Sequence, residues 1–522
     1  MPILTSDRTQ PSGSPLRPLE ISMALFARLE ADAVRHCHWK SNEHLEEALA
    51  GDTDLDLLVD PDRARESQEA LTGSGYKQVI SEKWIRYPGL EHWYALDQAT
   101  GKLSHVHLHY RLLSGRQYVK EQALPWEEVV LRSAVKHPEF EVFVTDPSLE
   151  LLILHVRIAV KTKYRQLVMG VLGKPLLPRN IVEEMEYLLS IARRPSVENY
   201  ARSLLGDELA MRFTEIVYDG DPGTLNGGLR LRSFVRRSLG QHRRYGPVRT
   251  TGRYLYYSLR LHPRLSAVRR LLHIETQNGK RLPHAGRIIA LVGADGAGKT
   301  TLVSEIEKWL RGRIDVTTVY LGSGEGSRGF GPLFRRSMAR LVGAYRKRYP
   351  RPNTLPESDD RSVSDTGKKG PLRSLYDLVI WFEYLSIARD STKKVKRAES
   401  RRREGTVVVA DRFPQSQATG IFDGPRMHAS PQSSWLQRTM AKREAAFYED
   451  VAEVRPELVV RLRVSLETAH QRKSDHPRAV LETRVNAVSD ISYPGSKVVD
   501  VDASRPLDEV LADVKAVVWE IL

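Results

Sequence analysis

From about residue 286 to the end of the chain, stretches with the apolar pattern of buried strands alternate with stretches that have the apolar spacing of helices. Residues 287–293, Arg-Ile-Ile-Ala-Leu-Val-Gly, form an almost continuous apolar run, which is typical of a strand buried on both faces of a parallel sheet. Residues 302–310 then carry apolar side chains at helical spacing. Two further apolar runs, 406–410 and 456–464, predict more strands of the same sheet. This alternation predicts an α/β domain with a parallel sheet flanked by helices.

The first half of the chain has a different pattern, in which short strands and helices precede a mostly helical stretch. Apolar residues recur at helical spacing from about residue 150, and the turn-rich sequence 219–228 ends this stretch. We therefore expect five segments: a disordered tail (1–17), an α+β domain (18–150), a helical extension (151–225), a basic connector (226–285) and the α/β domain (286–522).

The length and composition agree with a protein of several folded domains. A chain of 522 residues is too long for one hydrophobic core, and 41% hydrophobic and 28% charged residues are ordinary for a globular protein. The single cysteine, Cys37, cannot form an intrachain disulfide, which suits a reducing compartment. The N-terminus lacks the pattern of a signal peptide, and the longest apolar stretch, Leu149–Val160, is too short and too charged to span a bilayer. We expect a cytoplasmic location.

The net charge of +15 is concentrated in one part of the chain. Residues 226–285 contain 14 lysines and arginines against one acid, Glu275, which gives +13 of the total. Arginines alternate there with aromatic residues and leucines, as in Arg253-Tyr-Leu-Tyr-Tyr-Ser-Leu-Arg260. Such a segment favours an anionic partner: an anionic membrane surface, with the protein peripheral to it, a polyphosphorylated substrate, or, less favoured, nucleic acid. The alternative is a helical connector whose arginines contact acids of both neighbouring domains.

The sequence Gly293-Ala-Asp-Gly-Ala-Gly-Lys-Thr-Thr301 lies between the first predicted strand and helix of the α/β domain. A strand, G-x-x-x-x-G-K-T and a helix together are the context of a P-loop, whose main-chain amides hold phosphates at the helix N-terminus. We expect Lys299 to contact the β- and γ-phosphates and Thr300 to bind Mg²⁺. The predicted nucleotide-binding residues are Gly293, Asp295, Gly296, Ala297, Gly298, Lys299, Thr300 and Thr301, and the predicted cofactors are ATP and Mg²⁺.

Three more residues complete the predicted catalytic set. Asp411 ends the apolar run 406–410, where a carboxylate can hold the metal together with Thr300. Arg412 follows directly and could neutralise a transferring or accepting phosphate. Arg472 begins a basic turn, residues 472–478, that could close over the triphosphate as a lid; the alternative is a solvated helix end. Lys299, Asp411, Arg412 and Arg472 are thus the predicted catalytic residues.

The segment 286–522 resembles the thymidylate kinase branch of the nucleoside monophosphate kinases. The likeness rests on the P-loop with Asp295, on Asp411-Arg412-Phe413 in place of the family's D-R-Y/F, on Pro456-Glu-Leu-Val-Val460 and on the arginine-bearing segment from Arg472. The resemblance implies that Asp295 lies near the sugar hydroxyl of the acceptor and that Arg412 contacts the acceptor phosphate.

The acceptor side departs from that family. The stretch after Phe413 is replaced by Pro414–Gly420, and a long insertion between Gly322 and Leu375 contains a basic segment, Gly331–Arg348, with apolar residues on one helical face. That pattern fits a membrane-surface helix or a helix of a larger lid. The expected acceptor is therefore a nucleotide, sugar or glycan-type compound.

Residues 18–150 contain a second candidate site. Asp54 and Asp56 stand at i and i+2 in a predicted strand, so both lie on one face and can share a divalent cation. This part resembles the polymerase-β-like nucleotidyltransferases, in which a third carboxylate lies on a later strand. The corresponding strand here, Leu103–Tyr110, carries His105, His107 and His109 instead.

Three interpretations of this second site remain open. In the first, His107 or His109 completes a metal site with Asp54 and Asp56, since imidazole binds Mn²⁺ and similar ions. In the second, the site has lost catalysis and only binds; in the third, the two acids are ordinary surface residues. The predicted metal ligands of the chain are Thr300, Asp411, Asp54, Asp56 and His107.

Taken together, the sequence predicts an ATP- and Mg²⁺-dependent phosphotransferase acting on a small-molecule or glycan acceptor, bifunctional if the nucleotidyltransferase-like domain is active. The alternative is a nucleotide-dependent switch that binds an anionic membrane or nucleic acid through its basic connector.

Overall fold

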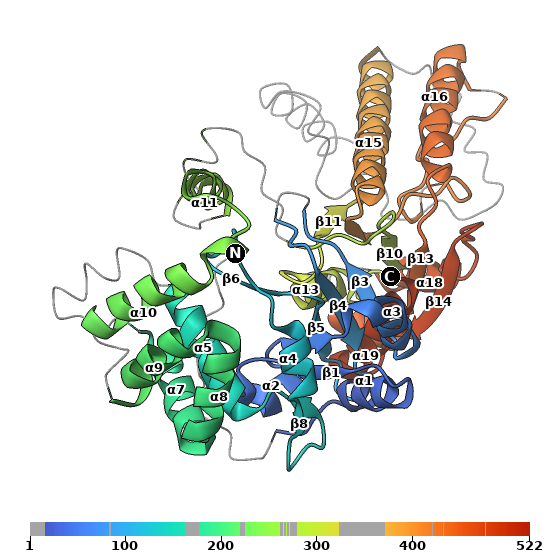
Figure 1. The fold of residues 1–522 in the computed structure, drawn as a ribbon. Coiled ribbons are helices and arrows are strands. Elements are labelled where there is room, and N and C mark those ends of the chain that lie inside the picture. The colour runs from blue at the N-terminus through green and yellow to red at the C-terminus, as the bar shows by residue number, and fades with distance from the viewer. Residues whose placement is uncertain are drawn as a thin grey trace. The chain divides into compact units, whose positions relative to one another are not determined.

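The computed structural model describes residues 16–82, 85–161, 177–219, 225–261, 279–322, 371–419, 421–431, 433–474 and 477–522, together with residues 265, 268 and 271. The chain forms two compact units, Met1–Lys280 and Arg281–Leu522 (Figure 1). The predicted tail up to residue 15 and the predicted helix at 331–348 lie outside the described residues.

The C-terminal unit is built on a five-stranded sheet in which every described pair of neighbouring strands is parallel. The strand order is β11 (Val316–Tyr320), β12 (Val407–Asp411), β10 (Ile288–Gly293), β13 (Leu458–Arg463) and β14 (Lys497–Asp502). β10 and β12 are buried at every position, as expected for strands covered on both faces. The predicted α/β class with a parallel sheet is confirmed.

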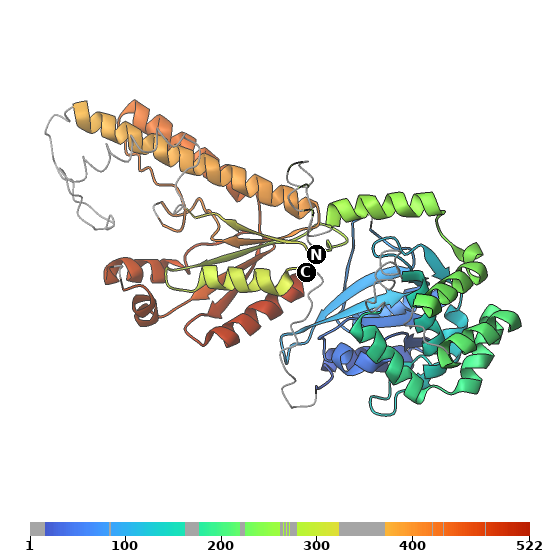
Figure 2. The same cartoon turned by 90° about the vertical axis from the view of Figure 1, so that its left-hand side faces the viewer.

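Helices cover both faces of this sheet. α15 (Pro371–Arg403) and α16 (Trp435–Ala452) lie side by side on one face, and α13 (Lys299–Leu310) and α19 (Leu507–Ile521) cover the other (Figure 2). Two shorter helices, α17 (Leu466–Arg472) and α18 (Arg478–Ala487), follow β13. The chain leaves β10 toward β11 on one side and later returns to β13 on the other. The carboxyl end of β10 is thus the topological switch point, where ligands of open α/β sheets bind.

The N-terminal unit contains a mixed sheet of seven strands. Its order is β3 (Lys77–Val79), β4 (Leu90–Leu96), β5 (Leu103–His109), β2 (Leu55–Val59), β1 (His36–His38), β9 (Phe143–Val144) and β8 (Val135–Lys136). α1 (Glu20–Ala31) and α3 (Ala64–Gly73) pack against each other, and their apolar residues share a core with β2 and β5. The remaining short elements are η1 (Asn42–His44), α2 (Leu45–Leu49), η2 (Pro61–Arg63), α4 (Glu127–Arg132) and the hairpin β6 (Leu112–Ser114) with β7 (Gln122–Leu124). The resemblance of this unit to nucleotidyltransferases stays a prediction.

A helical layer packs around α5 (Pro147–Lys161), which is buried along almost its whole length. It contains α7 (Arg179–Ile191), α8 (Arg194–Leu205), α9 (Asp207–Thr214), the π-helical turn η3 (Glu215–Asp219) and α10 (Leu225–Ser238), followed by η4 (Gly240–His242). The core of this layer also includes Cys37 and Trp39 from β1 and the residue after it. The predicted boundary between the α+β domain (18–150) and the helical extension (151–225) therefore lies inside α5. This helix joins the two predicted segments in one core.

The basic segment 226–285 divides into two parts with different environments. α10 packs against α5 and buries Leu231, Phe234 and Val235, so it belongs to the N-terminal unit and is not a free connector. The next helix, α11 (Pro247–Leu261), exposes Val248 (87%) and Leu255 (62%). Within the described ranges, none of the helices combines the length and the apolar character needed to cross a membrane.

Candidate functional site

The predicted P-loop connects β10 to α13 at the carboxyl edge of the sheet. Gly296 and Gly298 have φ angles of +85° and +82°, which favour glycine over residues with a Cβ. A Cβ at Gly293 would lie 2.7 Å from the carbonyl oxygen of Leu462, and one at Gly296 would lie 2.9 Å from that of Ala469. Among the described residues, apart from its two chain neighbours, no heavy atom lies within 4 Å of a Cβ placed on Gly298. The loop is thus held close to β13 and α17 on one side and leaves open space at the N-terminus of α13, where a phosphate fits.

Lys299 is buried at the start of α13 and turns back onto the loop. Its Nζ donates hydrogen bonds to the carbonyl oxygens of Gly293 (3.0 Å) and Ala294 (2.8 Å). Burial, together with the positive charge of Arg412, lowers the pKa of Lys299 to about 8. An anion near the ammonium would raise the pKa of Lys299 and so oppose both burial and the charge of Arg412. The position therefore favours a phosphate ligand.

Thr300 and Asp411 meet across the sheet edge as predicted. Asp411 is the last residue of β12 and pairs in register with Leu291 of β10. The Oγ1 hydroxyl of Thr300 donates a hydrogen bond of 2.7 Å to Asp411 Oδ2. The other carboxylate oxygen, Asp411 Oδ1, is buried and has no hydrogen-bond partner in the described part of the chain. A hydroxyl and a carboxylate with an unused oxygen are the hard ligands that Mg²⁺ prefers.

Two arginines hold Asp295 on the other side of the loop. Arg412, whose φ is +72°, donates to Asp295 Oδ1 at 2.9 Å and lies 3.5 Å from Asp423 Oδ2. Arg484 of α18 donates to the second oxygen of Asp295. Although burial acts to raise it, the pKa of Asp295 lies below its ordinary value because Arg484, Arg412 and Lys299 stabilise the carboxylate. Asp295 and Arg412, which the resemblance assigned separately to the sugar hydroxyl and the phosphate of the acceptor, are in contact with each other.

Sequence reasoning missed Arg484 and Asp423. Arg484 is 189 positions from Asp295, and nothing in its local sequence connects the two residues. Arg472, which was predicted, is at the last position of α17. Its Nη1 donates to the carbonyl oxygens of Gly296 (3.4 Å) and Ala503 (2.9 Å), so it contacts the P-loop. Residues 475 and 476 of the predicted lid lie outside the described residues.

The two remaining P-loop residues differ in exposure. Ala297 is buried beneath the loop, with its amide donating to the carbonyl of Ala294 at 3.2 Å. Thr301 is exposed in the first turn of α13.

A pocket lies beside the P-loop and is lined in part by Gly293, Arg412, Phe413, Phe422, Asp423 and Tyr493. The rings of Phe413 and Tyr493 meet edge to face at 6.5 Å between their centroids. The pocket therefore combines aromatic side chains with an arginine and a carboxylate.

The segment after Phe413 is organised by one buried amide. Gln415 Nε2 donates to the carbonyl oxygens of Ala418 (2.7 Å) and Ile421 (2.8 Å). Its Oε1 accepts from the amides of Gln417 (2.6 Å) and Ala418 (2.7 Å). These bonds fix the loop that leads to Phe422, so Gln415 is a positioning residue of the pocket wall.

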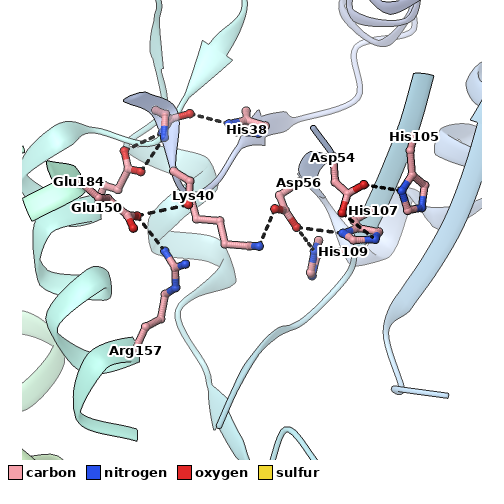
Figure 3. Close-up of polar contacts among 12 residues, drawn as sticks. His38, Lys40, Asp54, Asp56, His105, His107, His109, Glu150, Arg157 and Glu184 are labelled. Atoms are coloured by element: carbon pink, nitrogen blue, oxygen red, sulfur yellow. Dashed lines mark hydrogen bonds and ion pairs between the residues drawn. The ribbon is translucent and has the colours of Figure 1, made fainter. Parts of the chain in front are cut away.

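The second predicted site is a polar cluster on the sheet of the N-terminal unit (Figure 3). Asp56 of β2 is in register with His107 of β5. Its Oδ1 lies 3.3 Å from His107 Nδ1 and 3.1 Å from His109 Nε2, and its Oδ2 lies 2.5 Å from Lys40 Nζ. Asp54 Oδ1 lies 2.5 Å from His105 Nδ1. The structure thus brings together Asp54, Asp56 and His107, as predicted, and adds Lys40.

The electrostatics of this cluster follow from its burial and its mixed charges. Burial opposes ionisation of Asp56, but Lys40, His107 and His109 hold the pKa of its carboxyl well below the ordinary value. Burial lowers the pKa of His105 to about 3 and that of His109 to about 4. Both imidazoles are therefore neutral near pH 7, the form in which histidine binds metals.

A buried network continues behind Lys40 (Figure 3). Asn42 donates from its side chain to Glu150 Oε2 at 2.6 Å and from its main chain to Glu150 Oε1 at 3.1 Å. Asn42 Oδ1 lies 2.6 Å from His38 Nδ1, and Arg157 donates to Glu184 at 3.3 Å. Burial raises the pKa of Glu150 to about 8. The network ties the helical layer to the strand that precedes Lys40.

No family model matches the chain. The uncharacterized ATP-binding protein YghR of Escherichia coli K12 is 32% identical over 246 residues, which cover 46% of this chain and 91% of YghR. YghR of Escherichia coli O6:H1 matches to the same extent. The uncharacterized ATP-binding protein YghS of Escherichia coli K12 is 28% identical over 228 residues, 43% of this chain and 89% of YghS.

Among solved structures, deoxyadenosine kinase from M. mycoides with bound dCTP is 14% identical, with a TM-score of 0.25, over 44% of this chain and 98% of the kinase. The same kinase with bound dATP is 15% identical, with a TM-score of 0.24 and the same coverage. The identity to YghR and the near-complete coverage of that protein show that the chain belongs to the family of the ATP-binding protein YghR.

Proposed function

We propose that this protein is an ATP- and Mg²⁺-dependent phosphotransferase whose catalytic centre is the P-loop edge of the C-terminal unit. The observation that carries the proposal is the pair Thr300–Asp411, with Asp411 Oδ1 buried and unpartnered among the described residues. The open space at Gly298, at the N-terminus of α13, supports a polyphosphate ligand. ATP fits this site, and the relatives YghR and YghS are described as ATP-binding proteins.

Each residue of the site has a part in this proposal. The loop amides and Lys299 bind the β- and γ-phosphates, and Lys299 exchanges its two carbonyl contacts for phosphate oxygens. Thr300 and Asp411 would hold Mg²⁺, which neutralises charge on the phosphates. Arg412, Arg484 and Arg472 lie around the loop and stabilise the charge that develops during transfer.

The acceptor binds in the neighbouring pocket in this proposal. Phe413, Phe422 and Tyr493 offer apolar faces, while Arg412 and Asp423 offer one charge of each sign. Such a lining suits a nucleotide, sugar or glycan-type acceptor that carries a phosphate or a hydroxyl near Arg412 and Asp295. The acceptor oxygen would then attack the γ-phosphorus in line, the bond from that phosphorus to the β–γ bridging oxygen would break, and ADP would leave; a hydroxyl acceptor would lose its proton to solvent.

The test is a screen of acceptors with labelled ATP, combined with calorimetry of MgATP binding. Lys299→Ala should abolish both, whereas Lys308→Ala, on the exposed side of the same helix and paired with Glu305, should leave both intact. The absence of ATP binding in the presence of magnesium, or equal binding by the wild type and Lys299→Ala, would overturn the proposal.

A second candidate function is a nucleotide-dependent switch that contacts an anionic membrane. It is favoured by α11, which exposes Val248 and Leu255 beside Arg249. The switch predicts ATP hydrolysis without an acceptor and binding to vesicles containing phosphatidylserine. Binding should be lost in the double variant Val248→Glu/Leu255→Glu, and it should change on addition of nucleotide in the wild type but not in Lys299→Ala. In both cases we propose a cytoplasmic location, peripheral to the membrane in the second.

A further inference from the structure

Two imidazoles of the N-terminal unit face the same carboxylate oxygen. His107 Nδ1 lies 3.3 Å and His109 Nε2 lies 3.1 Å from Asp56 Oδ1 (Figure 3). The ligand atoms of the three residues all lie within 4.8 Å of one another. We infer that Asp56, His107 and His109 bind a divalent first-row transition ion such as Zn²⁺, in preference to Mg²⁺. This inference does not rest on the phosphotransferase proposal.

The contacts of His107 point to an ion between these residues. His107 lies between two carboxylates, with Nδ1 toward Asp56 Oδ1 and Nε2 3.7 Å from Asp54 Oδ2. A neutral imidazole carries one N–H, so it can donate to only one of the two. Only the contact with Asp56 is within hydrogen-bond distance, and a metal on Nδ1 would take the place of that hydrogen bond while Nε2–H stays directed toward Asp54. That is the carboxylate–histidine–metal arrangement in which the outer carboxylate orients the ligand. An imidazolium could also satisfy both carboxylates, so the test must detect the ion itself.

The strands hold the three ligands in place before any ion binds. His107 and His109 are two residues apart on β5, and Asp56 is the register partner of His107 on the adjacent strand β2. Trp39 packs edge to face against His109, with 5.3 Å between the ring centroids. Lys40 binds Asp56 Oδ2 at 2.5 Å and leaves Oδ1 for the ion. Asp56 is therefore expected to bind the ion through one oxygen.

The donor set determines which ions can bind. Two imidazole nitrogens and one carboxylate oxygen suit Zn²⁺, Fe²⁺, Co²⁺ or Ni²⁺, whereas Mg²⁺ prefers a shell of oxygens. Three protein ligands also leave a coordination position open for water or an anion. This role differs from the sequence prediction, in which Asp54 was itself a ligand; here Asp54 orients His107.

A second group of imidazoles competes for the same ion. His92, His105 and His107 also bring ligand atoms within 4.8 Å. In the described part of the chain, His92 Nδ1 and His105 Nε2 are buried without a hydrogen-bond partner. Because His107 belongs to both groups, substitutions at His92 and His109 distinguish them.

The test uses the full-length protein, freed of metal with a chelator and titrated with ZnCl₂ by calorimetry and with CoCl₂ by visible absorption. We expect one equivalent of ion, not displaced by millimolar MgCl₂. His109→Ala and Asp56→Asn should abolish saturable binding, and Asp54→Asn should weaken it by roughly 10- to 100-fold. His92→Ala and His242→Ala, a control in η4, should bind as the wild type does.

Far-UV circular dichroism and urea titration show whether each variant is folded. Absence of saturable Zn²⁺ and Co²⁺ binding in the folded wild type would overturn the inference. So would a loss of binding in His92→Ala with retention in His109→Ala. Displacement of the ion by MgCl₂ would overturn the stated preference.

Discussion

The Thr300 hydroxyl and the Asp411 carboxylate, 111 positions apart, are joined by a hydrogen bond of 2.7 Å at the carboxyl edge of the parallel sheet. Asp411 Oδ1 remains buried beside this bond and without a partner among the described residues. A buried carboxylate oxygen without a donor is costly, and a cation would satisfy it.

Asp411→Asn therefore tests the role of this carboxylate. The amide oxygen can still accept from Thr300, so the fold should be kept while the charge is lost. We expect the increase in ATP affinity caused by magnesium to disappear and the affinity measured in EDTA to stay unchanged. Calorimetric titrations with and without magnesium measure both. An undiminished magnesium effect in Asp411→Asn would show that the ion is held elsewhere.

The lowered pKa of Lys299 predicts a pH dependence of nucleotide binding. With a pKa of about 8 the side chain is mostly charged at pH 7 and loses its proton as the pH rises through 8. Bound phosphate favours the charged form, so binding takes up a proton above pH 8 and the affinity falls, at most tenfold per pH unit. Lys299→Arg should remove this dependence because guanidinium stays charged. An identical pH profile in both proteins would exclude Lys299 as its source.

Asp295 neutralises two arginines that would otherwise attract anions. Arg412 and Arg484 each contact one of its oxygens, and its pKa is low enough that it is charged at neutral pH. We expect Asp295→Asn to bind tripolyphosphate several-fold more tightly, with a stronger dependence on salt. Asp500→Asn is the matched control, because Asp500 also pairs with two arginines, on β13, away from the loop. Equal effects of the two substitutions would indicate only a change in net charge.

The basic helix α10 should contribute to the stability of the N-terminal unit. Leu231 is fully buried in the helical layer, whereas Leu229 of the same helix is 45% exposed. Leu231→Ala should lower the free energy of unfolding by about 2–5 kcal/mol, and Leu229→Ala should change it by about 0.5 kcal/mol or less. Urea titrations followed by far-UV circular dichroism measure the difference. Similar values for both variants would indicate that α10 does not pack as described.

The sequence was most informative where local pattern and chemistry coincide. The strand, glycine loop and helix around Lys299 could be read directly, and the acid at the end of a second apolar run was correctly brought next to Thr300. The P-loop and Asp411 lie together because the carboxyl ends of parallel strands meet at the same edge of a sheet. Asp56 and His107 were placed together by the resemblance to nucleotidyltransferases, and they are register partners on adjacent parallel strands.

The remaining contacts depend on packing between segments far apart in the sequence. Arg484 reaches Asp295 only because α18 folds back over the loop, and Lys40 reaches Asp56 from the turn after β1. The segment containing α10 looked like a connector because its arginines dominate the composition. Leu231, Phe234 and Val235 nevertheless belong to one buried core with α5, a distinction that charge counting cannot make.

The two carbonyl contacts of Lys299 have a consequence for ligand choice. A ligand draws the ammonium away from Gly293 and Ala294 only if it supplies oxygens at least as attractive as these two main-chain acceptors. Adenosine and adenosine monophosphate offer no second or third phosphoryl group and so leave the side chain where it lies. The carbonyl contacts of Lys299 should therefore make the loop select ligands by the number of their phosphoryl groups.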